Sequence, residues 1–247
     1  MTTEELKEYA KEGLLVGARM AYAILKGAIL TRVNLSGIDL YMADLSRADL
    51  TSAVLTDADL SEANLSWTTL VRADLTHASC INTNFCGADL SEARFIKTNL
   101  TLADLSWTRL DRAVFTCACL SRANLQHANL AGANLQAISM REVNLAHADL
   151  RGASLCESNL FHAILENADL TGAKLCQANL IDANLRNANL TDADLTDAVL
   201  KGANLEGAKL PRAILHGAIM MGATLLNADF QDANLSWADM KGCKWTK

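Results

Sequence analysis

The amino-acid sequence predicts an all-β solenoid, and three regularities lead to that prediction. From Leu25 to Met240 every fifth residue is bulky and apolar, which makes 44 successive positions, most of them leucine. The residue two before each of these positions is small, usually alanine, and the residue between the two is usually asparagine or aspartate. The eleven glycines of residues 23–247 all lie two residues after a bulky position.

A period of five matches neither an α-helix nor a flat strand. An uninterrupted short repeat is typical of a solenoid, in which each unit buries its apolar side only against its neighbours. We call the bulky position of each unit its centre. The centre and the small residue two before it are expected to point inward, and the other three residues outward. The glycines indicate a turn after each centre, because glycine accepts a positive φ at no steric cost.

Units such as ADLSE at 58–62 and ANLRN at 183–187 resemble the repeats of the pentapeptide-repeat family, over about nine-tenths of the chain. The resemblance implies a right-handed quadrilateral β-helix with four units, or 20 residues, in each coil. The 44 units would then form about 11 coils. At the usual spacing of paired strands, such a rod is about 53 Å long.

The ends of the chain are expected to differ from the repeats. We expect an N-terminal helix and cap in residues 1–22, the β-helix in 23–242 and a tail in 243–247. Residues 3–12 look helical, and the stretch 5–13 is similar to the start of cyanobacterial family members. Thr2 with Glu5 suits the start of this helix, Gly13 suits its end, and the apolar face of Leu6, Tyr9 and Ala10 is expected to cover the first coil.

The composition, 51% apolar with 5% aromatic residues, predicts one soluble folded body without a membrane span. The acidic N-terminus argues against a secretory signal, and we therefore expect a cytoplasmic protein. Seven scattered cysteines fit a reducing compartment. Cys156 and Cys176 should be stacked on adjacent coils, but neighbours on parallel strands rarely have suitable geometry, so free thiols are expected. Trp245 leaves two readings open, a plug of the last coil or a frayed tail.

The sequence does not predict an enzyme. It contains no glycine-rich phosphate loop, metal-ligand spacing or nucleophile motif. Most of the aspartates occupy the position before a centre, where the repeat pattern itself has Asp or Asn. We therefore assign no catalytic, cofactor-binding or metal-binding residue. His127 and His147 should adjoin, but no carboxylate or thiol joins them, and we interpret them as hydrated surface histidines.

With 20 residues in a coil, residues 20 apart become neighbours, and two outward rows carry unusual apolar residues. Trp67 and Trp107 share one row with Arg47, and Gly87 between them leaves room for both indoles. A second row and its neighbours form the least polar side of the rod. These are the candidate interaction residues: Arg47, Trp67, Trp107, Tyr41, Met42, Ile81, Leu102, Phe161 and Ile181.

The sequence is compatible with two binding functions. The first is a protein–protein interaction scaffold with an unknown protein partner, such as a cyanobacterial regulator, because one cyanobacterial family member modulates heterocyst differentiation. The alternative follows the quinolone-resistance members, which mimic DNA and bind gyrase. The net charge is −6, whereas a DNA segment of the same length carries roughly 31 phosphates, so we rank mimicry second.

The acidic balance of the chain also bears on other partners. Direct binding of nucleic acid is not expected at a pI near 5.4. No membrane partner is expected. The protein is predicted to be a monomer or an end-to-end homodimer through its C-terminal edge, because a solenoid leaves unpaired edges at its ends.

Overall fold

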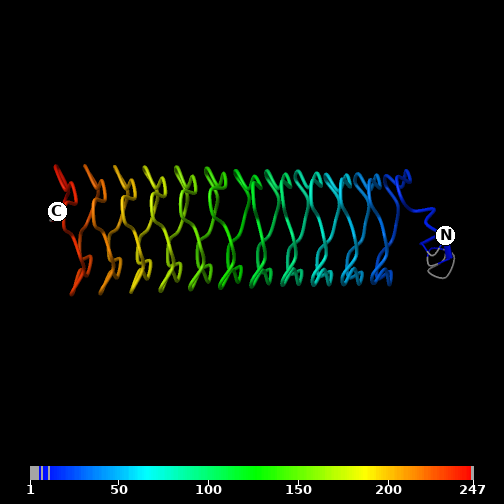
Figure 1. The fold of residues 1–247 in the computed structure, drawn as a ribbon, viewed down its shortest axis with the longest axis horizontal. Coiled ribbons are helices and arrows are strands. Elements are labelled where there is room, and N and C mark those ends of the chain that lie inside the picture. The colour runs from blue at the N-terminus through cyan, green and yellow to red at the C-terminus, as the bar shows by residue number, and fades with distance from the viewer. Residues whose placement is uncertain (1–5, 7, 11, 246–247) are drawn as a thin grey trace.

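The protein is a rod of stacked coils (Figure 1). A computed structural model describes residues 6, 8–10 and 12–245. Parallel bridges join each bridged residue to the one 20 positions later, from Arg19 with Asp39 to Thr224 with Lys244. Bridges recur every five residues, so each coil has four sides, as the resemblance implies. The extended segments are isolated bridges of one residue each rather than longer strands.

We number the four faces by their bridged residues. Each bridged residue is followed directly by a centre. The two residues after that centre form the corner at which the face ends. The bridged residues recur every 20 positions from Arg19 on face 1, from Ile24 on face 2, from Ile29 on face 3 and from Asn34 on face 4.

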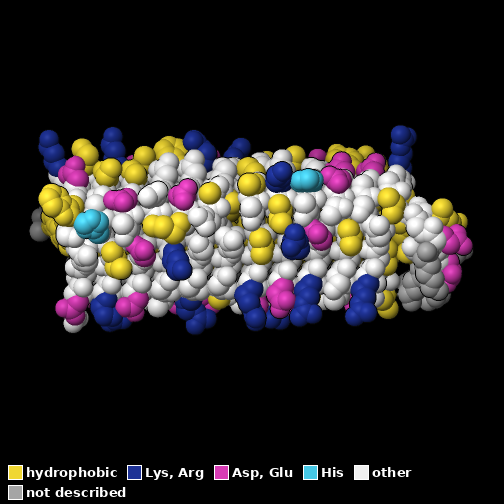
Figure 2. All heavy atoms as spheres, in the orientation of Figure 1, with side chains coloured by type: hydrophobic (Ala, Val, Ile, Leu, Met, Phe, Trp, Pro, Cys, Tyr) yellow, Lys and Arg dark blue, Asp and Glu magenta, His cyan; other side chains and the backbone are white. Residues whose placement is uncertain are grey.

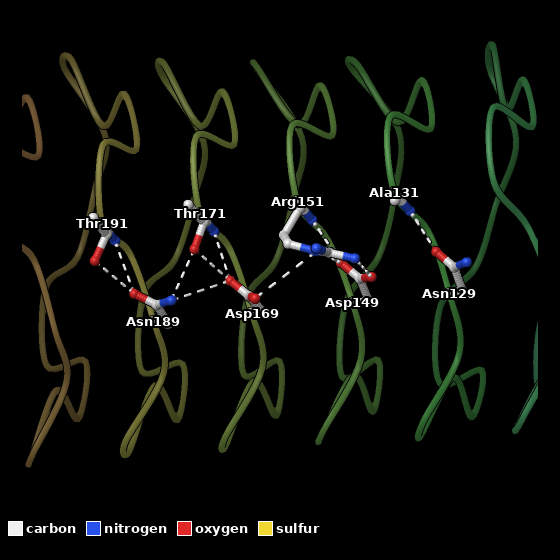
Figure 3. Close-up of polar contacts among 8 residues, drawn as sticks. All are labelled: Asn129, Ala131, Asp149, Arg151, Asp169, Thr171, Asn189 and Thr191. Atoms are coloured by element: carbon white, nitrogen blue, oxygen red, sulfur yellow. Dashed lines mark hydrogen bonds and ion pairs between the residues drawn. The ribbon is translucent and has the colours of Figure 1, made fainter.

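Hydrogen bonds satisfy all five backbone N–H groups of a repeat unit, as the unit 148–152 shows. Two of the N–H groups donate to carbonyls of the next coil, one donates to a carbonyl of the previous coil, and one donates to a carbonyl within the same turn. The fifth is bonded by the side chain of the unit's own aspartate (Figure 3). The bonds are Ala148 N to Leu145 O (3.1 Å), Asp149 N to Ala128 O (2.9 Å), Leu150 N to Asp169 O (2.7 Å), Gly152 N to Thr171 O (3.0 Å) and Arg151 N to Asp149 Oδ1 (3.1 Å).

The corner residue two after each centre lies in the left-handed region of backbone space. Non-glycine residues there have φ between 53° and 62°. This region costs an L-residue roughly 1–2 kcal/mol, and the inter-coil hydrogen bond of the same residue offsets part of that cost. The turn predicted after each centre is confirmed, but most corners carry side chains, including Trp67 and Trp107.

The core is a column of the centre residues with small residues between them. From Leu30 to Leu225 the centres are at most 1% exposed, which confirms the inward positions. Phe95 and Phe115 stack at 4.8 Å with an interplanar angle of 5°. Where threonine replaces the small alanine, its hydroxyl donates to a backbone carbonyl, as from Thr83 to Leu60 O at 2.7 Å. The interior is therefore filled and its polar groups are paired.

The N-terminal segment leads into the first coil. Residues 6 and 8–10 are helical, and Gly13, with φ of 72°, follows the helix as expected. Leu6 is 2% exposed and joins the core, whereas Tyr9 on the same predicted face is 45% exposed. The expected capping residues Thr2 and Glu5 lie outside the described residues. Among the residues described, no helix is long and apolar enough to cross a membrane.

At the C-terminal end, the centres Phe230, Leu235 and Met240 are only partly buried against the core. Trp245 is half exposed, and its ring centroid lies 5.8 Å from that of Phe230. Trp245 thus packs against the edge of the last coil without closing it.

The expectation of free thiols at Cys156 and Cys176 is wrong, because the two form a disulfide. Both residues occupy the first turn position after a centre, on adjacent coils. Their Cα atoms are 4.6 Å apart, within the range that a disulfide spans. The rule for neighbouring parallel strands does not apply, since these cysteines lie at a corner rather than on a strand.

Candidate interaction surface

One row of candidate residues runs along the corner that follows face 2, and we call it the tryptophan corner. Each member lies two residues after a centre, at positive φ, so its side chain projects away from the filled core. The corner consists of Arg47, Trp67, Gly87, Trp107, His127 and His147. The structure thus places Arg47, Trp67 and Trp107 in one straight row, as the sequence predicted.

Gly87 is what allows Trp67 its position. A Cβ atom at Gly87 would lie 2.7 Å from the six-membered ring of Trp67, closer than real contacts permit. The indole therefore rests on the backbone of the next coil, where any other residue would place a side chain. Trp67 still has 62% of its surface exposed.

Trp107 is held in a different way, by stacking. Its ring lies 4.0 Å from that of His127, nearly parallel at 15°. His127 in turn stacks on His147 at 4.8 Å and 9°. The two histidines are exposed, as expected, but they form a ring ladder that supports Trp107, which the sequence reading did not anticipate. No group of three metal-ligating side chains occurs among the residues described.

The second row lies at the corner that follows face 1. Met42, Ile81 and Leu102 are 45%, 38% and 43% exposed. Tyr41 is half-buried, and the nearby carboxylate of Glu62 raises the pKa of its phenol. These four residues form a loose apolar group toward the N-terminal half of the rod.

Phe161 and Ile181 continue this row several coils further on, but they are less available. The guanidinium of Arg141 lies 4.7 Å above the Phe161 ring. The ring of His162 approaches the same phenylalanine edge-on at 4.1 Å. Ile181 is half-buried. The structure therefore separates these two residues from the group at Tyr41 to Leu102.

Face 2 lies between the two corners and is polar. Along it, Asn64 donates to Asp44 (3.2 Å) and Asn124 donates to Asp104 (3.1 Å). The nine candidate residues consequently form two rows along neighbouring edges of one polar face, not a single apolar patch. Of the two rows, only the tryptophan corner presents indole rings, and both of these have more than half of their surface exposed.

The aspartates that precede a centre each accept a hydrogen bond from a backbone N–H of their own coil. Asp149 accepts from the backbone N–H of Arg151 and pairs with its guanidinium at 2.6 Å (Figure 3). The side-chain hydrogen bond from Arg151 is the main cause that lowers the pKa of Asp149, against an opposing effect of burial. Figure 2 shows basic and acidic side chains interspersed along one face of the rod. The side of the rod that Figure 2 shows carries mixed charge rather than an acidic stripe.

A shallow hollow lies at the corner diagonally opposite the tryptophan corner. Its volume is about 210 Å³, and its lining includes one free thiol but no carboxylate or imidazole. The thiol therefore has no adjacent base in the lining of the hollow, as a nucleophile requires. The lining residues are Thr116, Cys117, Asn134, Gln136 and Ala137.

Several exposed apolar residues were not predicted from the sequence, among them Tyr22, Ile24 and Trp237. Tyr22 is 66% exposed and contacts Tyr41 edge-on at 5.8 Å, which extends the second row by one coil. Ile24 and Trp237 are 82% and 86% exposed. Tyr22 and Trp237 fall on corner positions of the 20-residue register, and that placement was the available signal.

Comparison with known proteins places the chain in a family. The sequence model of the pentapeptide-repeat family matches almost all of the rod. The matched residues are 14–46, 38–76, 69–106, 78–116, 118–155, 138–177, 157–192, 178–217, 188–225 and 212–244. No curated protein matches the chain.

Two solved structures are similar to this one. HetL, a pentapeptide-repeat protein involved in heterocyst differentiation regulation from the cyanobacterium Nostoc sp. strain PCC 7120, is 32% identical. The match covers 98% of this chain and 96% of HetL, with a TM-score of 0.53. QnrB1, a plasmid-mediated fluoroquinolone resistance protein, is 20% identical over 70% of this chain and 90% of its own, with a TM-score of 0.52. The likeness to QnrB1 concerns the fold alone.

The family match spans more than half of the chain, and the likeness to HetL extends over nearly the whole length of both proteins. The repeated unit, the four-sided coil and the leucine core of the structure agree with that match. This chain is therefore a member of the pentapeptide-repeat family, with the β-helix fold of that family.

Proposed function

We propose that the protein is a non-enzymatic scaffold that binds a protein partner through the tryptophan corner. The observation that carries this proposal is the pair of indoles at Trp67 and Trp107, 62% and 61% exposed in one row of a rigid rod. Tryptophan is enriched among the residues that dominate binding energy at protein interfaces. Exposed aromatic rings of this size on a filled rod support a docking role.

Both rings already have packing partners within the protein itself. Trp67 rests on Gly87, and Trp107 stacks on His127. A partner that covers them therefore loses little side-chain entropy on binding, since the cost of ordering a side chain at an interface has been met by the fold. The corner backbone is held by inter-coil bonds, from Trp67 N to Cys86 O at 2.9 Å and from Trp107 N to Gln126 O at 3.0 Å.

The likeness to HetL supports a regulatory role in a cyanobacterium. HetL is described as taking part in the regulation of heterocyst differentiation, and it aligns with this chain almost end to end. We propose a cytoplasmic location and a similar kind of role, in which the rod acts by occupying a partner rather than by chemistry. The paired aspartates and the lining of the hollow support the absence of catalysis.

The test is affinity capture from the native cell with matched variants. The double variant Trp67→Ala, Trp107→Ala should retain the fold and lose most of the partner captured by the wild type. The control variant Trp237→Ala removes a more exposed tryptophan from another corner and should capture as the wild type does. Equal capture by the double variant and the wild type would refute the proposal.

The second candidate remains a gyrase-binding mimic of DNA. The resemblance to the quinolone-resistance members favours it, while the ion-paired aspartates of face 3 weigh against it, since DNA presents unpaired phosphates. A supercoiling assay with purified gyrase distinguishes the two. We expect no inhibition and no protection from quinolone at micromolar protein, and either effect would promote this candidate above the first.

We also propose that the rod is a monomer or pairs end to end. The partly exposed centres Phe230, Leu235 and Met240 at the C-terminal edge support the paired form. Light scattering after size exclusion gives the mass, and Leu235→Asp should abolish a dimer formed through this edge. A dimer that persists in that variant would place the interface elsewhere.

A further inference from the structure

We infer that the ligand of the tryptophan corner is an extended proline-rich segment in the polyproline II conformation, with prolines three residues apart seated on Trp67 and Trp107. This inference rests on the proposed function and names the chemistry of its partner. It starts from the spacing of the two coils that carry the indoles.

The spacing of the coils is fixed along the rod. Residues 20 apart are separated by 4.6 Å between the Cα atoms of Cys156 and Cys176, and by 4.8 Å between the rings of His127 and His147. Trp67 and Trp107 are two coils apart on the same corner, which places their equivalent backbone atoms about 9.5 Å apart along the rod axis. A polyproline II helix has three residues per turn and rises about 3.1 Å per residue, so every third side chain recurs at about 9.3 Å.

Other extended or helical ligands fit this row less well. Side chains on one face of a β-strand recur at about 6.7 Å and 13 Å, and neither spacing meets both rings. Strand addition also needs a free sheet edge, and the coil backbone here is already paired, as from Trp67 N to Cys86 O. An amphipathic helix docks into an apolar groove, whereas the two indoles project from a corner of the rod beside the polar face 2.

The chemistry of the corner suits such a segment. Each indole packs against the next coil of the same corner, Trp67 against the backbone of Gly87 and Trp107 against the ring of His127, and keeps about three-fifths of its surface free. Aromatic surfaces are what proline-recognition domains present to a ligand. The polyproline II backbone has no internal hydrogen bonds, so its carbonyls can accept from the indole N–H groups. Gly87 adds no side chain between the two rings.

The experiment titrates the full-length protein with synthetic peptides and follows the indole N–H signals by NMR. The probe is a peptide of about twelve residues with proline at every third position. The control peptide has the same composition with prolines at alternating spacings of two and four residues. We expect the probe to shift the signals of Trp67 and Trp107 and to leave that of Trp237 unmoved. The control peptide should bind at least about tenfold more weakly.

Variants test the geometry as well as the rings. Trp67→Ala and Trp107→Ala should each weaken probe binding roughly tenfold or more, and Trp237→Ala should not change it. Gly87→Asn retains both tryptophans. It introduces a residue type that adopts positive φ at other corners, as Asn82 does. Its side chain must lift Trp67 out of place, so Gly87→Asn should remove the preference for the three-residue spacing.

The outcomes separate this inference from the proposed function. Absence of probe binding, or equal affinity for both peptides, would overturn the inference. If capture of the cellular partner still depends on Trp67 and Trp107 in that case, the proposed function stands and its ligand is of another kind. If capture does not depend on the two tryptophans, the proposed function itself fails.

Discussion

At the residue scale, an asparagine or aspartate that precedes a centre has a defined physical role. Its side-chain oxygen accepts from the backbone N–H two residues later, as from Ala131 to Asn129 and from Arg151 to Asp149 (Figure 3). In the unit 148–152, this N–H is the only one that the coil backbone leaves unpaired. Asn and Asp are suited to this local bond because their short side chains reach the backbone two positions on.

The charge of Asp149 predicts a dependence of stability on pH. Its pKa is lowered in the fold, chiefly by the side chain of Arg151. A lowered pKa adds stability above the unfolded value, about 3.9, and that stability is lost as the pH falls through the folded value. The variant Asp149→Asn keeps the acceptor for the Arg151 N–H but loses the charge. Its deficit in urea midpoint should therefore be present at pH 7 and shrink below about pH 4.

A neutral variant provides the control for this pH series. Asn129→Ala removes the acceptor of the Ala131 N–H at 3.0 Å without changing any charge. Its deficit in urea midpoint should be the same at pH 7 and at pH 3. If the deficit in urea midpoint of Asp149→Asn were also the same at pH 7 and at pH 3, the charge of the carboxylate would contribute nothing to stability.

At the element scale, each coil is stabilised by the centre residues that stack along the rod. Leu125 is fully buried within the column of centres. Coils contact only their neighbours, so stability is roughly a sum of coil and interface contributions. Damage to one centre should therefore weaken the adjoining coils most.

Substitution of Leu125 tests this packing. Leu125→Ala should lower the free energy of unfolding by about 2–5 kcal/mol through the cavity it leaves. Leu125→Asp buries an unpaired charge and should prevent folding of the surrounding coils. The neighbouring control Gln126→Asp, at an outward position, should change stability by less than about 0.5 kcal/mol. Chemical denaturation followed by circular dichroism measures all three. A harmless Leu125→Asp would contradict the filled core.

The disulfide joins two coils that are also bonded through their backbones. Leu155 N donates to Lys174 O at 2.6 Å and Glu157 N donates to Cys176 O at 2.8 Å. Reduction should therefore leave the far-UV spectrum unchanged. It should lower the free energy of unfolding by up to about 3 kcal/mol, the entropic effect expected for a loop of about this length.

The control for the disulfide is the variant Cys176→Ser, whose unfolding midpoint dithiothreitol should not alter. In the wild type, identical midpoints with and without dithiothreitol would show that the bond between Cys156 and Cys176 adds nothing to stability.

At the scale of the whole molecule, the period of five made most of the fold predictable. It indicated which residues point inward, where the chain turns and which residues 20 apart are neighbours. The sequence could not show how neighbouring side chains orient, because a register gives adjacency but not rotamer. For that reason the stacking of Trp107 on His127 and the disulfide were missed. Phe161 was placed correctly, but its cover by Arg141 was not foreseen.

The tryptophan corner follows from the register as much as the core does. Trp67 and Trp107 share a corner only because 40 residues make two complete coils. Gly87 lies between them for the same reason, and its missing side chain is what lets Trp67 lie down on the next coil. The proposed function and its inferred ligand both depend on this geometry, in which a sequence separation converts directly into a distance along a straight rod.

A set of spin-label distances along one corner tests most directly whether sequence separation is proportional to distance along the rod. Labels at Arg72→Cys, Gly152→Cys and Asp232→Cys, with reactive native thiols replaced by serine, lie four coils apart in sequence register. Electron–electron distance measurements should give two equal inner separations of about 19 Å and an outer one of about 38 Å, their sum. Unequal inner separations, or an outer separation well short of that sum, would contradict a straight rod with 20 residues in each coil.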